Sequence, residues 1–133
     1  MKALKILIDP CYPEPLVNSL MTIHELQEEK RFEIFSWYDG IEHNFPLAET
    51  IFLAVDHSKK GLTEVNIKQI EEGYRLFVMK VDGVLDFFEF AMTVFRVWPF
   101  IIEKSRENKN KKFCYTFKYG GRKLNRMKGI PIY

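Results

Sequence analysis

The stretch Leu4–Pro15, LKILIDPCYPEP, decides how the rest of the chain is organised. It opens with an apolar run of strand length, and that run ends at one carboxylate, Asp9. Pro10, Pro13 and Pro15 cannot continue a central strand, and a proline at position 15 suits the first turn of a helix. An acid after a first strand lies where an open α/β sheet places its chemistry, although an Asp before Pro is also an ordinary start of a turn.

The rest of the chain continues this alternation of strands and helices. The periodicity predicts a helix over 15–29, a strand over 31–38 that ends at the turn pair Asp39-Gly40, a loop over 41–50, a strand over 50–55, a helix over 64–72, a strand over 74–81, a helix over 86–104, a strand over 113–119 and a returning arm over 122–127. We therefore expect one α/β domain over residues 1–133, with three layers and a mainly parallel sheet of about five strands covered by helices on both faces. Right-handed crossovers would bring the ends of the first and third strands to one edge of the sheet.

Several of these elements have a face that can be read from the sequence. The helix over 15–29 carries Leu16, Val17, Leu20, Met21 and His24 on one side at helical spacing. The apolar residues of the 64–72 helix, Val65, Ile67 and Ile70, are expected to point inward. The final strand alternates aromatic with smaller or polar residues, which gives it one aromatic face: Phe113, Tyr115, Phe117 and Tyr119. In a protein of this fold without catalysis, we expect this face to contact RNA by stacking on its bases.

Charge divides the chain into an acidic body and a basic end. Residues 1–103 carry ten Lys/Arg and seventeen Asp/Glu, a balance of −7, whereas the strand and arm of residues 104–133 carry ten Lys/Arg and one acid, a balance of +9. A basic end suits a nucleic-acid partner, although a solvated tail has the same composition. The residues expected to contact nucleic acid are Lys109, Lys111, Lys112, Lys118, Arg122, Lys123 and Arg126.

The sequence also gives expectations about the location of the protein. No apolar run approaches the length of a membrane span, and no signal peptide is visible at the start of the chain. Cys11 and Cys114 lie far apart and do not have the spacing of a metal site. Reduced thiols in a cytoplasmic protein are therefore expected, with no membrane partner.

Three stretches together resemble the PIN-like domain family, which includes the VapC-type toxin ribonucleases and their shorter relatives. ILIDPCYPEPLVNSL resembles the opening strand, acid, linker and helix of that family, and IFLAVDHSK resembles its third-strand segment, in which an acid follows an apolar run. LFVMKVDGVLDFFEFAMTVFRVWPFIIEKSRENKNKKFCYTF resembles the ending of the shorter members. These stretches cover most of the chain, and the resemblance rests on their order and spacing.

The resemblance implies a ribonuclease whose carboxylates hold Mg²⁺ or Mn²⁺, hard cations that prefer oxygen ligands. Asp9 matches the acid of the first strand and Asp56 matches the acid after the third strand. Asp39 lies near the distance expected for the middle acid, and Glu42 and Glu49 are further candidates for that role. The implied catalytic residues are thus Asp9, Asp39, Glu49 and Asp56, with Asp9, Asp39 and Asp56 as metal ligands.

Three functions stay open at this point. The first is a metal-dependent ribonuclease, the toxin of a toxin–antitoxin pair, whose partners would be RNA and an antitoxin protein. The second is a PIN-like protein without catalysis that binds RNA or another protein, and a homodimer is compatible with either. The third is an α/β domain with neither activity, in which Asp9, Asp39 and Asp56 only form turns at strand ends.

Overall fold

The structure is a computed structural model that describes residues 3–27, 31–107 and 111–127. Its elements are β1 (Leu4–Ile8), α1 (Glu14–Leu26), β2 (Phe32–Ser36), α2 (Trp37–His43), the 3₁₀ helix η1 (Leu47–Glu49), β3 (Thr50–Asp56), α3 (Glu64–Glu71), β4 (Arg75–Lys80), α4 (Phe87–Glu107), β5 (Cys114–Lys118) and β6 (Asn125–Arg126). None of the helices in these residues is long and apolar enough to cross a membrane. Both cysteines are free thiols, Cys11 at the surface and Cys114 in the interior.

The strands form one sheet in the order β2-β1-β3-β4-β5-β6. The first five strands run parallel, and the short β6 pairs antiparallel with β5. The expected α/β fold with a mainly parallel sheet is therefore confirmed, and the returning arm adds a sixth strand. The order of the first five strands is one of the two common doubly wound orders, in which ligands bind outside the carboxyl ends of β1 and β3.

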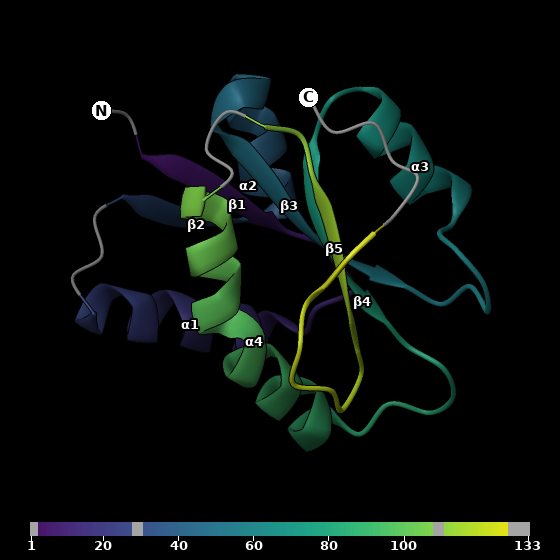
Figure 1. Ribbon diagram of the computed structural model, residues 1–133. Helices are drawn as coiled ribbons and strands as arrows, with labels where there is room; N and C mark the ends of the chain where they lie inside the picture. The colour runs from purple at the N-terminus through teal and green to yellow at the C-terminus, as the bar shows by residue number, and fades with distance from the viewer. Residues whose placement is uncertain (1–2, 28–30, 108–110, 128–133) are drawn as a thin grey trace.

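Helices cover both faces of the sheet, as Figure 1 shows. On one face α1 and α4 pack on the larger part of the core, which includes Ile6, Leu53, Phe77 and Phe117. On the other face α2 and α3 cover a smaller cluster that contains Leu7, Phe52, Leu76 and Val78. This alternation follows from the strand period of two, because neighbouring residues of a strand point to opposite faces.

The chain turns into a helix earlier after β2 than the sequence pattern predicts. The strand ends at Ser36, and Asp39 and Gly40 lie inside α2 instead of forming a turn. A Cβ atom on Gly40 would lie only 2.3 Å from Cγ of Leu7, so a glycine is needed where this helix presses on β1. The expected loop over 41–50 consequently begins with a helix and ends with η1.

The inward side of α3 also differs from the prediction. Val65 is 68% exposed and Ile67 is exposed as well, whereas Asn66 between them is 4% exposed. Ile70 is half-buried and packs against the smaller core cluster. The cause is a hydrogen bond from Nδ2 of Asn66 to Oδ2 of Asp56 at 2.9 Å, which turns a polar side chain toward the sheet.

Candidate functional site

Asp56 lies at the carboxyl end of β3, and its side chain is completely buried. Protein donors surround both of its oxygen atoms. Oδ1 accepts hydrogen bonds from the backbone nitrogen of Ser58 at 2.8 Å, from the Ser58 hydroxyl and from Nζ of Lys80 at 2.9 Å, and Oδ2 accepts from the backbone nitrogen of Thr63 at 2.7 Å and from Nδ2 of Asn66 at 2.9 Å. A buried carboxylate is tolerated when it is paired and hydrogen-bonded in this way.

Opposing effects act on the pKa of the Asp56 carboxyl. Burial alone would raise this pKa, because a charge is poorly solvated in the interior. The hydrogen bonds from Ser58, Thr63, Lys80 and Asn66 favour the ionised form, and together they hold the pKa of Asp56 well below its usual range. The carboxylate is thus stabilised as an anion by the protein itself.

Lys80 holds the loop that follows β3. It is the cross-strand neighbour of Asp56, at the end of β4. Besides Asp56, its Nζ donates to the carbonyl oxygen of Ser58 at 3.0 Å and to that of Gly61. Gly61 has a φ of 64°, a conformation that glycine adopts without strain. The buried Asp56 and the partly exposed Lys80 therefore form an ion pair that holds the loop between β3 and α3.

This pair predicts a particular response to acid. Because the pKa of Asp56 is lower in the folded than in the unfolded state, the unfolded chain binds more protons, so the contribution to stability is complete above about pH 4 and is lost below it. Asp56→Asn should be less stable than the wild type at neutral pH, and its free energy of unfolding should fall less steeply between about pH 4 and pH 2. Urea denaturation at several pH values in this range measures how the free energy of unfolding of each protein depends on pH. The same dependence in the wild type and in Asp56→Asn would contradict a lowered pKa of Asp56.

Asp9 directly follows β1, on the strand that neighbours β3, as predicted. Its backbone nitrogen donates to the carbonyl of Leu53 at 2.9 Å, and its Oδ1 accepts from the backbone nitrogen of Cys11 at 2.7 Å. Ile8 pairs with Leu53 in the sheet, so Asp9 lies level with Ala54 of β3. Asp56 is two residues farther along β3, so the two acids are offset by about 7 Å along the strand direction. Asp9 therefore has a turn-forming contact of its own.

The remaining acidic candidates are distributed around the sheet. Asp39 and Glu42 are exposed in α2, which follows the carboxyl end of β2. Glu49 ends η1, immediately before β3 begins, and its Oε1 lies 3.5 Å from Nζ of Lys5. It belongs to the amino end of the strand, opposite the end that carries Asp56. The structure thus does not bring Glu49 to Asp9 and Asp56.

The donor set does not fit the metal ion that the resemblance implies. Among the described residues no group of three His, Cys, Asp or Glu side chains could hold a metal ion. Asp56 already accepts hydrogen bonds from five donors, one of them the ammonium group of Lys80. A divalent cation at Asp56 would compete with Lys80 and the loop donors for the two carboxylate oxygens. It would therefore have to displace Lys80 and break the contacts of the loop.

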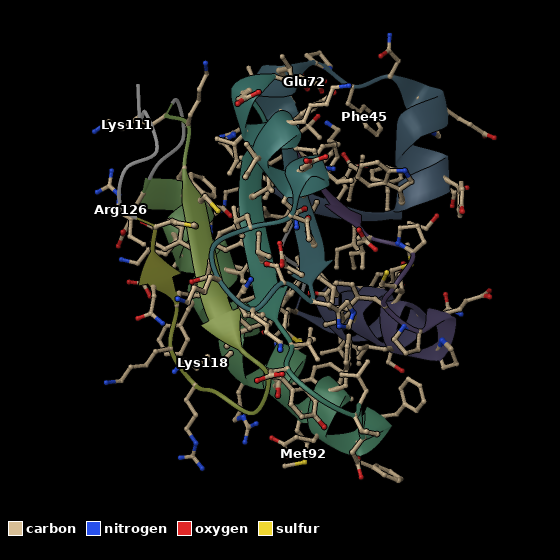
Figure 2. All side chains as sticks on the ribbon, turned by 90° about the vertical axis from the view of Figure 1, so that its right-hand side faces the viewer. Phe45, Glu72, Met92, Lys111, Lys118 and Arg126 are labelled. Atoms are coloured by element: carbon tan, nitrogen blue, oxygen red, sulfur yellow. The ribbon has the colours of Figure 1, made fainter. Side chains whose placement is uncertain are left out.

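Basic side chains gather along the edge of the sheet formed by β5 and β6. In the described part of the chain this basic edge consists of Lys111, Lys112, Lys118, Arg122, Lys123 and Arg126. Figure 2 shows Lys111, Lys118 and Arg126 along this edge, with Lys111 near one end of β5 and Lys118 near the other. All of them except the half-buried Lys112 are exposed. Lys109, also expected to contact nucleic acid, lies outside the described residues.

The basic edge includes one pocket. Lys111 and Lys112 line a cavity of about 270 Å³ together with Arg75 and Glu72. Arg75 is almost completely buried, burial lowers its pKa, and one of its guanidinium nitrogens donates to the carbonyl oxygen of Ala48. Three cationic residues and one acidic residue make this pocket positive, which suits a phosphate group.

The aromatic face of the last strand is not a stacking surface. Phe113, Tyr115 and Phe117 are buried in the larger core cluster, and the half-buried Tyr119 packs against it. The ring of Phe77 on β4 lies 5.1 Å from that of Phe113 and 5.7 Å from that of Tyr115. The suggestion that these rings stack on RNA bases is therefore wrong, because α4 and the neighbouring strand cover them.

Sequence reasoning singled out Asp56 but missed all of its partners. Lys80 ends an apolar strand and Asn66 interrupts an apolar pattern, so each was a polar residue in a buried setting. Polar side chains in buried positions usually have hydrogen-bond partners, so these two residues could have been recognised from the sequence as candidates for a buried polar contact. Comparison with protein-family models, with curated proteins and with solved structures found no match.

Proposed function

We propose that this protein binds RNA through the basic edge and that Asp56 has a structural role. The observation that carries the proposal is the clustering of six cationic residues on β5, β6 and the segments beside them. The acidic remainder of the chain, with a balance of −7, would repel a polyanion and so restrict binding to this edge. Lys and Arg along an edge contact phosphates, so this binding has little dependence on base sequence.

The fold and the resemblance favour RNA as the polyanion. The PIN-like family implied by the three stretches acts on RNA, and the mainly parallel α/β sheet is compatible with that resemblance. Because the aromatic residues of β5 are buried, the binding would depend on charge and not on stacking. The pocket lined by Arg75, Lys111 and Lys112 offers a place for one phosphate of the strand.

The ribonuclease function implied by the same resemblance has less support. Asp9 and Asp56 follow neighbouring strands, as that function requires. However, both oxygens of Asp56 already accept hydrogen bonds from Lys80 and the following loop and helix, and Glu49 lies at the other end of β3. We therefore favour the binding module over the ribonuclease and over a toxin held by an antitoxin.

Titration of fluorescently labelled single-stranded RNA at several salt concentrations tests this proposal. Each phosphate contact on a single strand should contribute about −0.7 to the slope of log K against log salt, so one contact for each of the six residues of the basic edge predicts a slope of about −4. Fluorescence anisotropy measures the affinity. Absence of binding at low salt, or an affinity that does not depend on salt, would refute the proposal.

A further inference from the structure

The pocket at one end of the basic edge is built by segments that are far apart in the sequence. Its lining comes from η1, from the turn between α3 and β4, from the start of β4 and from the segment before β5. Figure 2 shows Glu72 and Lys111 at the end of the molecule away from Lys118. The pocket therefore lies at the amino end of the parallel strands β4 and β5, and the rest of the basic edge extends from it along β5.

The cationic side chains of this pocket lie at different depths. Arg75 is only 4% exposed, and its guanidinium group donates to the carbonyl oxygen of Ala48. Lys112 is half-buried and packs against the turn at Gly73, where an added Cβ atom would lie 3.5 Å from its Cε and 3.8 Å from its Nζ. Gly73 has a φ of 101°, a conformation that favours glycine. Lys111 is exposed, so a ligand meets it first and must enter the pocket to reach Arg75.

The charge and the depth of the pocket favour the end of an RNA strand over its interior. Three cationic residues and Glu72 give the lining a net charge of +2. A phosphate monoester at a strand end carries about −1.5 to −2 at pH 7, whereas each phosphate inside the strand carries one negative charge. An internal phosphate also has a nucleotide on both sides, while a terminal phosphate has one on a single side. The terminal phosphate therefore matches the charge better and can enter this cavity of about 270 Å³ end-on.

We propose that this pocket binds the terminal phosphate monoester of a single-stranded RNA whose following phosphates lie along the basic edge. The inference rests on the proposed function and adds a preference for a phosphorylated strand end. Arg75 and Lys112 donate charge-assisted hydrogen bonds to the phosphate oxygens, and Lys111 contacts them from the rim. Internal phosphates are equivalent to one another and let a protein slide along the strand, so the pocket fixes the position at which this protein binds.

Fluorescence anisotropy with three short, internally labelled RNAs of one sequence tests the inference. One RNA has hydroxyl groups at both ends, one has a 5′-phosphate and one has a 3′-phosphate. A phosphate at one of the two ends should tighten binding at least about 10-fold, the effect of one charge-assisted hydrogen bond. Equal affinities of the three RNAs would overturn this inference and leave the proposed function intact, whereas absence of binding by all three would overturn both.

Single substitutions at the two ends of β5 locate the preference. Lys112→Gln should lower the preference for the phosphorylated RNA several-fold, and Lys111→Gln should lower it as well, at an exposed residue whose replacement leaves the fold intact. Lys118→Gln is the matched control, because it removes the same charge from the other end of β5 and should weaken the binding of all three RNAs equally. An unchanged preference in Lys111→Gln and in folded Lys112→Gln, or an equal loss in Lys118→Gln, would overturn the assignment to this pocket.

A free nucleotide is the other source of the same phosphate chemistry. Adenosine 5′-monophosphate carries the monoester but has no further phosphates to contact the basic edge. At equal concentration it should therefore displace the labelled, phosphorylated RNA far less than the unlabelled form of that RNA does. Equal displacement by the two competitors would mean that the pocket binds a free nucleotide, and this would overturn the assignment to an RNA end.

Discussion

Lys80→Met should lower the free energy of unfolding by about 3 kcal/mol, because it leaves the buried Asp56 carboxylate without its cation. Methionine keeps most of the length of the lysine side chain, so the change removes charge and hydrogen bonds and little volume. The loop carbonyls of Ser58 and Gly61 lose the same donor. Urea denaturation followed by circular dichroism measures the loss.

Two further variants separate the ion pair from other effects. Lys118→Met is the control, since Lys118 is the cross-strand neighbour of Lys80 on β5 but is exposed, and it should change the stability by less than about 0.5 kcal/mol. Adding Asp56→Asn to Lys80→Met should recover part of the loss, because the buried charge is then removed. Equal effects of Lys80→Met and Lys118→Met would mean that Lys80 does not hold Asp56.

Phe117→Ala should lower the free energy of unfolding by about 3 to 5 kcal/mol, the usual cost of deleting a completely buried phenylalanine ring. Its ring is in the core cluster between the sheet and α4. The exposed Lys118 beside it in the same strand provides the comparison, since Lys118→Ala should be nearly neutral. A stable Phe117→Ala protein with weakened RNA binding would show instead that the aromatic residues form the binding surface.

The order of strands and helices could be predicted because the local patterns and the final packing agree. The apolar runs that end at Asp9 and Asp56 form neighbouring parallel strands, since buried strands are continuous apolar runs. The face of α1 that carries Leu16, Val17 and Leu20 is buried as its period indicates. Right-handed connections then left few arrangements of the sheet.

The parts that could not be predicted depend on contacts between distant residues. Val65 and Ile67 look like an inward face until Asp56, ten residues before Asn66, is known to need a hydrogen bond from that amide. Gly40 reads as a turn residue unless Leu7 is known to lie against it. Likewise, no local pattern shows that Lys80 at the end of β4 will lie beside Asp56 at the end of the adjacent β3. Tertiary contacts override local propensity at each of these positions.

The affinity for single-stranded RNA at low salt, compared between two charge-matched variants, tests the central claim most directly. One variant replaces Lys118, Arg122, Lys123 and Arg126 of the basic edge with glutamine, and the other replaces Lys59, Lys60, Lys68 and Arg31, which are exposed elsewhere. Both lose four positive charges. We predict that the first variant binds RNA at least about 100-fold more weakly than the wild type and the second binds nearly as well as the wild type. Equal affinities of the two variants would contradict an RNA site on the basic edge.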